Sequence, residues 1–181
     1  RIERCEVRTS AWGDGEFRGG FGLRREVRIL GERGALSVLS EKNVIPPHGV
    51  EGGSNGAANH FVVIRDGEIT SPSDVPGKVS GFALRTGDIV REETAGGGGY
   101  GDPLKREPEK VLADVSEEYL TALEAMHRYG VVISGNSVDG AATAAKRAEL
   151  SGARISVALE LTDEELSDGP KRQFIVPKDL A

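Results

Sequence analysis

Residue types that build disulfides, metal sites and catalytic centres are scarce in this sequence. Its 181 residues include one cysteine, one tryptophan and three histidines, and aromatic residues make up 5%. The lone Cys5 excludes an internal disulfide and a cysteine metal cluster, and it fits a reducing cytoplasm. No apolar run approaches the ~20 residues of a transmembrane helix, and no secretory signal pattern is present. We therefore expect a cytoplasmic protein without a membrane partner.

Positive charge is also in short supply, because the formal net charge is −6 at pH 7. Nucleic acids and anionic membranes attract proteins through a concentrated positive field, so neither is an expected partner. Arginines are locally dense only at Arg24, Arg25 and Arg28. On a strand, Arg24 and Arg28 share one face and Arg25 lies on the other. Two interpretations remain open for this strand: a solvated edge, or a contact for an anion.

Glycine is abundant instead: of its 25 residues, 11 lie in three clusters, Phe17–Gly22, Glu51–Gly56 and Ala95–Pro103. None of them ends in the Gly-Lys-Ser/Thr of a phosphate loop, and the third lacks the flanking strand and helix of a dinucleotide site. A run such as Gly96–Gly99 is needed where the backbone turns with positive φ or passes closely under another chain. The other interpretation is a loop that lines a substrate or subunit cavity.

The spacing of apolar residues changes near residue 104. Before it, short alternating segments between glycine and proline turns predict antiparallel strands. We expect hairpins between 22–30 and 35–39 and at Asp66-Gly67. After it, a period of about 3.6 residues predicts helices. The predicted fold class is α+β, with a β-rich antiparallel half over about 1–103 and a helical C-terminal extension.

Helix boundaries follow from the local signals of the second half. Pro108 suits the first turn of one helix, Ser116 is the expected cap of the next, and Gly130 is its expected stop. A further helix is predicted over about 139–150, and Thr162–Glu165 match a capping box.

The predicted domain covers residues 1–150, β-rich over 1–103 and helical over 104–150. A short helix and a polar tail, expected to lie as an arm on a partner, follow over 151–181. The chain begins at Arg1 without a methionine, which predicts a fragment, a processed chain or a trimmed product.

The histidines, His48, His60 and His127, are widely spaced, whereas metal binding and acid–base catalysis need them to converge with carboxylates. Only His48 lies in a loop of turn residues, where it is either a solvated histidine or part of a site. No Gly-x-Ser-x-Gly elbow and no His-Glu-x-x-His motif occurs. We expect no metal site, and these patterns assign no catalytic residue.

The order of several short motifs is more specific than any one of them. In chain order they are Gly15–Glu26, Pro46–Gly53, Pro76–Lys78, Gly87–Val90, Thr94–Pro103 and Tyr129–Val132. Together they resemble the C-terminal region of the hydantoinase B/oxoprolinase family over about residues 4–150. The sequence Gly-Gly-Gly-Gly-Tyr-Gly-Asp-Pro is specific, although Ala95 stands where proline is expected.

The resemblance implies a component of a two-part enzyme, either an ATP-dependent hydrolase of cyclic amides or a related ketone carboxylase. Members of the family include N-methylhydantoinase, 5-oxoprolinase and subunits of acetone and acetophenone carboxylases. Its expected partners are the remainder of a hydantoinase B-type subunit, a hydantoinase A-type subunit and a small-molecule substrate. ATP and a divalent metal are implied for the whole complex and no cofactor for this chain, which is expected to be inactive alone. The alternative is a non-catalytic module that assembles the complex.

The candidate site residues follow from these motifs. The loops with His48, Gly52, Gly53, Gly97, Gly98 and Tyr100 are expected to line a cavity or a subunit contact. Arg18 and Arg24 are candidate contacts for an anion.

Overall fold

The computed structural model describes residues 1–9 and 11–159. The capping box predicted at Thr162–Glu165 and the predicted tail from Pro170 lie outside these residues, as does most of the segment 151–181. In chain order the elements are β1 (Ile2–Arg8), β2 (Gly22–Arg28), β3 (Arg33–Leu39), β4 (His60–Arg65), β5 (Glu68–Thr70), β6 (Lys78–Arg85), β7 (Ile89–Glu93), η1 (Pro103–Lys105), α1 (Pro108–Ser116), α2 (Ala122–Tyr129), β8 (Ile133–Ser134), β9 (Ser137–Val138) and α3 (Gly140–Leu159).

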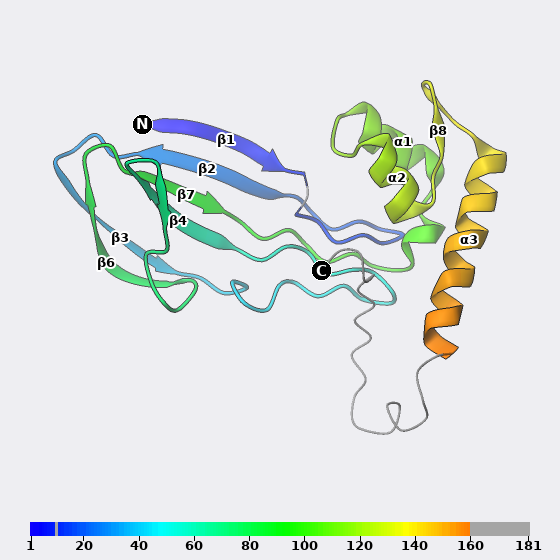
Figure 1. The fold of residues 1–181 in the computed structure, drawn as a ribbon, viewed down its shortest axis with the longest axis horizontal. Helices are drawn as coiled ribbons and strands as arrows, with labels where there is room; N and C mark the ends of the chain where they lie inside the picture. Colours follow the sequence, from blue (N-terminus) through cyan, green and yellow to red (C-terminus); the bar gives the residue numbers. More distant parts are fainter. Residues whose placement is uncertain (10, 160–181) are drawn as a thin grey trace.

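The strands of the first half form two antiparallel layers (Figure 1). One is a five-stranded sheet in the order β1-β2-β7-β4-β5, and the other is a two-stranded ribbon of β3 and β6. Arg65 of β4 joins the layers, since its Nη2 donates to the Ala83 carbonyl of β6 at 2.9 Å. The helices follow only after this β-rich half, so the predicted α+β class and the change near residue 104 are confirmed.

Of the two predicted hairpins, one is confirmed and one is wrong. Asp66 and Gly67 both have positive φ, 52° and 87°, and they join β4 to β5 as a tight two-residue turn. The hairpin between 22–30 and 35–39 does not form, because β2 pairs with β1 and β7 on its two edges and β3 pairs with β6. Local turn signals marked the chain reversal, but they do not encode these long-range partners.

Local capping signals set the ends of the helices in the second half. Pro108 begins α1 and Gly130 ends α2 with a φ of 64°, both as predicted. The predicted cap at Ser116 is wrong, because this residue ends α1 and its hydroxyl donates to the Leu112 carbonyl. Thr121 caps α2 instead, in a reciprocal capping box with Glu124.

The hydrophobic core of the helical half is completed by a residue from the start of the chain. Trp12 is buried together with Val111, Leu120, Ala125, Tyr129 and Val131. Its indole packs edge-on against Phe21 with ring centroids 5.0 Å apart. The segment that follows β1 is therefore part of the helical core as well as the connection to the sheet. Among the described residues, no helix has the length and apolar character needed to cross a membrane.

Candidate functional site

Three glycine-rich segments run side by side between the sheet and the helices (Figure 1). They are residues 11–20, 48–57 and 94–103, and we call them the glycine bundle. Tyr100 lies at their junction, since it bridges Phe17 in antiparallel fashion and Val50 in parallel fashion. The predicted motif loops, which are far apart in the sequence, are thus brought together at one place.

In the third segment Gly96–Gly99 are required by close backbone approach and not by positive φ, because none of them adopts the left-handed conformation; Gly101, with a φ of 76°, does. A methyl group on Gly98 would overlap the carbonyl oxygen of His48, and one on Gly99 would overlap that of Asp14. Of the interpretations open for this run, the passage under other chain segments is the one that the structure shows.

The chain segment that each glycine of Gly96–Gly99 faces repeats after three residues. Gly96 and Gly99 face 11–14, Gly97 faces 19–20 and Gly98 faces 48–49. A period of three is typical of a polyproline II helix, which has no hydrogen bonds of its own. Such a segment is held only by bonds to its neighbours, and a side chain would push each neighbour away.

Several backbone N–H groups of the third segment are bonded inside the bundle. Gly97 N donates to the Gly20 carbonyl, Gly99 N to the Ser54 carbonyl and Gly101 N to the Val50 carbonyl, each at 2.9 Å. A phosphate cradle needs N–H groups that point at the ligand. These three donors already have carbonyl partners, so the bundle is arranged as a packing core.

The predicted cavity- or interface-lining residues all belong to this bundle. Gly53 lies against the backbone of Gly99 and Tyr100, and Gly52 has a φ of 93° beside it. The His48 carbonyl faces Gly98, while the His48 residue is exposed to solvent. Their role as a lining remains a prediction.

The two arginines predicted as anion contacts are both engaged with carboxylates. Arg18 Nε lies 3.1 Å from Asp114 Oδ1, and its guanidinium stacks on Phe21 with 4.4 Å to the ring centroid. Arg24 lies in the sheet, away from the bundle, and donates to Glu93 at 2.7 Å and to Glu6 at 3.1 Å.

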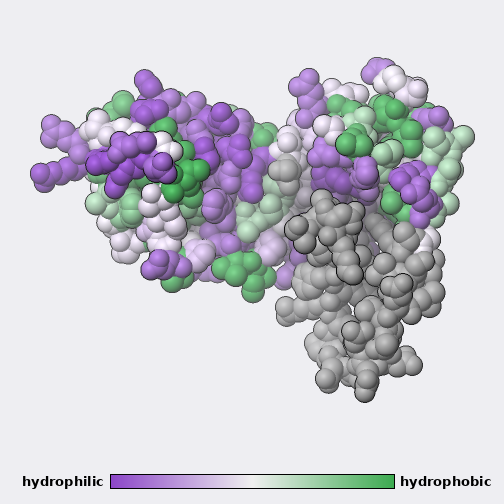
Figure 2. All heavy atoms as spheres, viewed as in Figure 1, coloured by the Kyte–Doolittle hydropathy of each residue, from purple (hydrophilic) through white to green (hydrophobic). Residues whose placement is uncertain are grey.

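Arg24 belongs to a charged face of the five-stranded sheet. Its hydrogen bond to Glu93 is the main cause that raises its pKa. On the same face, Glu26 accepts from Arg91 at 2.7 Å. Arg25 points to the other face, as the strand pattern predicted, and its Nη2 donates to Glu92 at 2.6 Å. Hydrophilic residues cover much of the sheet in the view of Figure 2.

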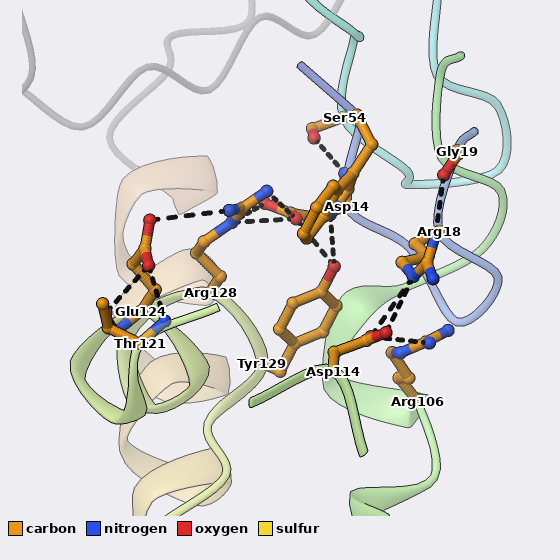
Figure 3. A network of polar contacts seen from close by, with 11 residues as sticks. Asp14, Arg18, Gly19, Ser54, Arg106, Asp114, Thr121, Glu124, Arg128 and Tyr129 are labelled. Atoms are coloured by element: carbon orange, nitrogen blue, oxygen red, sulfur yellow. Dashed lines mark hydrogen bonds and ion pairs between the residues drawn. The ribbon is translucent and has the colours of Figure 1, made fainter. Parts of the chain in front are cut away.

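A polar network fastens the bundle to helix α2 (Figure 3). The Arg128 Nε donates to both carboxylate oxygens of Asp14 at 2.9 Å. The Tyr129 hydroxyl donates to Asp14 at 2.8 Å and accepts from the Trp12 indole at 3.1 Å. Burial, followed by the nearby Asp14 carboxylate, raises the pKa of Tyr129 above its usual value, so the hydroxyl keeps its proton for this bond.

A second group of charges fastens the bundle to α1 (Figure 3). Asp114 is almost completely buried, and it accepts from Arg18 and, at 3.0 Å, from Arg106 Nη2. Arg106 also donates from Nη1 to the Glu16 carbonyl at 3.2 Å. Its Nε is buried without a hydrogen-bond partner in the described part of the chain. Arg106 is therefore a buried cation that depends on one carboxylate.

Sequence reasoning missed these anchoring residues. Asp14, Arg106, Asp114 and Arg128 pair with partners up to 114 residues away, and each looks like an ordinary charged surface residue in its own segment. The sequence signal that could have led to them is Tyr129-Gly130, because Tyr129 belongs to this network and the dipeptide was already among the family motifs. In the described residues, no group of three or more histidine, cysteine, aspartate or glutamate side chains is placed to hold a metal ion.

The arrangement agrees with the comparisons with known proteins. Residues 1–103 match the sequence profile of the family described as Hydantoinase B/oxoprolinase. The chain belongs to this family. The caprolactamase subunit beta of Pseudomonas jessenii is 37% identical over 154 residues, which cover 81% of this chain and 26% of that protein.

Solved structures of related proteins share the fold. The ATP-dependent caprolactamase from Pseudomonas jessenii superposes with a TM-score of 0.62 at 32% identity, over 81% of this chain and 26% of that one. A nucleotide-free acetone carboxylase superposes with a TM-score of 0.70 over 91% of this chain and 26% of that one. Its identity of 22% shows a common fold alone. The chain spans about a quarter of the length of three curated relatives, 22%, 23% and 26%, and 8% of the 5-oxoprolinase of Saccharomyces cerevisiae.

Proposed function

We propose that this chain is a component of an ATP-dependent enzyme of the hydantoinase/oxoprolinase type, either a cyclic-amide hydrolase or a related ketone carboxylase. In this proposal the chain supplies architecture to the B-type part, and a hydantoinase A-type partner uses ATP and a divalent metal. In this proposal we expect neither ATP nor the metal to bind to this chain itself. Membership of the family carries the proposal, and the relatives' names, caprolactamase and acetone carboxylase with ATP dependence, give its reaction class.

The internal bonding of the glycine bundle supports an architectural role. The backbone N–H groups of Gly97, Gly99 and Gly101 donate to carbonyl groups of the same chain. The carboxylates of Asp14 and Asp114 pair with arginines that anchor the helices. These groups therefore hold the bundle together and are not free for a substrate.

Reconstitution of the complex tests the proposal. The chain is combined with the rest of a hydantoinase B-type subunit, an A-type partner and MgATP. Release of ADP is then measured with 5-oxoproline or hydantoin, and separately with acetone and bicarbonate. We expect ADP release coupled to loss of one of these substrates, and a fall to background when the chain is omitted. Turnover that is unchanged without the chain would contradict the proposal.

A structural module without influence on the reaction is the second candidate. The polar networks in which the Asp14 and Asp114 carboxylates bind the arginines that anchor the helices favour it. Light scattering after size-exclusion chromatography distinguishes it: a module for assembly forms a stable complex with the other polypeptides, and turnover stays unchanged when it is left out.

A further inference from the structure

Three apolar side chains are exposed together where the three segments of the glycine bundle meet. Phe17 is 58% exposed, Val50 53% and Tyr100 53%. The rings of Phe17 and Tyr100 are tilted to each other with centroids 6.3 Å apart. Both Phe17 and Val50 form backbone bridges with Tyr100. We call these three residues the aromatic patch.

The backbone beneath the aromatic patch is fixed. Phe17 N donates to the Tyr100 carbonyl at 3.0 Å and Tyr100 N donates to the Phe17 carbonyl at 2.9 Å, while Val50 N bonds the Gly99 carbonyl at 2.9 Å. Aromatic side chains held on a rigid backbone lose little conformational entropy when they bind. Tyrosine and other large side chains in such positions are typical of interface hot spots.

Two carboxylates adjoin the aromatic patch along the chain. Glu16 precedes Phe17 and Glu51 follows Val50. Neither carboxylate has an ion pair among the described residues, in contrast to the paired glutamates of the sheet. An apolar centre with an acidic rim complements an apolar side chain that stands beside a lysine or arginine.

We propose that the aromatic patch docks a segment of the remainder of the hydantoinase B-type subunit, one that presents an apolar side chain next to a basic residue. This inference rests on the proposed function. In the caprolactamase and acetone carboxylase chains about three quarters of the length lies outside the region matched here, so the rest of the same subunit offers a large surface that can cover the patch. The rigid apolar centre gives the affinity, and Glu16 and Glu51 select the basic neighbour.

Binding of the chain to the rest of the subunit tests this proposal. Dissociation constants are measured for the wild-type chain and for Tyr100→Ala and Glu51→Lys. Loss of a hot-spot side chain is expected to weaken binding about 30-fold for Tyr100→Ala. Glu51→Lys is expected to weaken binding severalfold, and higher salt is expected to narrow its difference from wild type. Glu51 is exposed and touches no packing core, so this variant keeps the proposal testable even if Tyr100→Ala folds poorly.

Ile69→Ala is the matched control, because Ile69 is 62% exposed on the edge strand β5. It is expected to bind like the wild type. If the wild-type chain binds and all three variants bind equally well, the docking proposal is wrong while the component role stands. If the wild-type chain does not bind the rest of the subunit, or binds only an A-type subunit or a second copy of itself, both the docking proposal and the proposed B-type role are overturned.

Discussion

Gly19→Ala is expected to destabilise the protein by more than about 3 kcal/mol, whereas Gly20→Ala next to it changes the free energy of unfolding by less than about 1 kcal/mol. A methyl group on Gly19 would overlap the carbonyl oxygen of Gly97, which cannot move without breaking the bundle. Around Gly20 no atom lies within 4 Å of the added methyl group. The two substitutions are chemically identical and differ only in this space.

Urea unfolding of the two variants measures this difference. Trp12 is the single tryptophan, and it is buried where the bundle meets the helical core, so its fluorescence reports on the bundle. Equal unfolding midpoints for Gly19→Ala and Gly20→Ala would show that the backbone approach is looser than described. The same pair serves in the reconstituted enzyme, where only Gly19→Ala is expected to lose ADP release.

Asp114→Ala is expected to cost about 3–5 kcal/mol of stability, because it leaves the buried Arg106 guanidinium without a counter-charge. The side chains of Asp114 and Arg106 are only 7% and 8% exposed. The comparison substitution is Glu149→Ala, which removes a salt bridge to Lys146 from a glutamate that is 66% exposed. Exposed pairs contribute at most about 1 kcal/mol, so this control is expected to stay close to the wild type.

A double variant separates the lost charge pair from other effects of Asp114→Ala. In Asp114→Ala/Arg106→Met the buried cation is also gone, and stability is expected to recover partly. Unfolding midpoints are compared for the two single variants and the double variant. Additive losses would mean that Asp114 and Arg106 act independently, contrary to the 3.0 Å contact between them.

Much of the fold follows from short-range signals in the sequence. Asp66-Gly67 encodes its own turn through positive φ, and Gly130 encodes the end of α2 in the same way. The pairing of β3 with β6 has no such signal, because strand partners are chosen by burial over long separations. The prediction that Ser116 caps the next helix was wrong because α2 does not begin there. The chain first passes through a turn with a φ of 61° at Glu118, and Thr121 then caps α2.

The sequence indicated which loops form the candidate site, but not the bonding partners of its charged side chains. Clustered glycines indicated close backbone approach, and the structure places His48–Gly53 against Gly96–Tyr100, although the sequence did not predict that the two loops meet. The partners of Arg18 and Arg24 were not predictable, because an arginine has the same sequence pattern whether it binds an anion or a carboxylate of its own chain. Only the fold brings Asp114 and Glu93 to them.

Amide hydrogen exchange at Gly97, Gly99 and Gly101 tests most directly whether the glycine run is a packing core of the enzyme component or a nucleotide loop. Their N–H groups are bonded to carbonyls of the bundle, so they are expected to exchange slowly, like the amides of the central sheet strands. Addition of MgATP is expected to leave these rates unchanged. Rapid exchange of these amides without nucleotide, followed by protection when MgATP is added, would contradict the architectural role of the bundle.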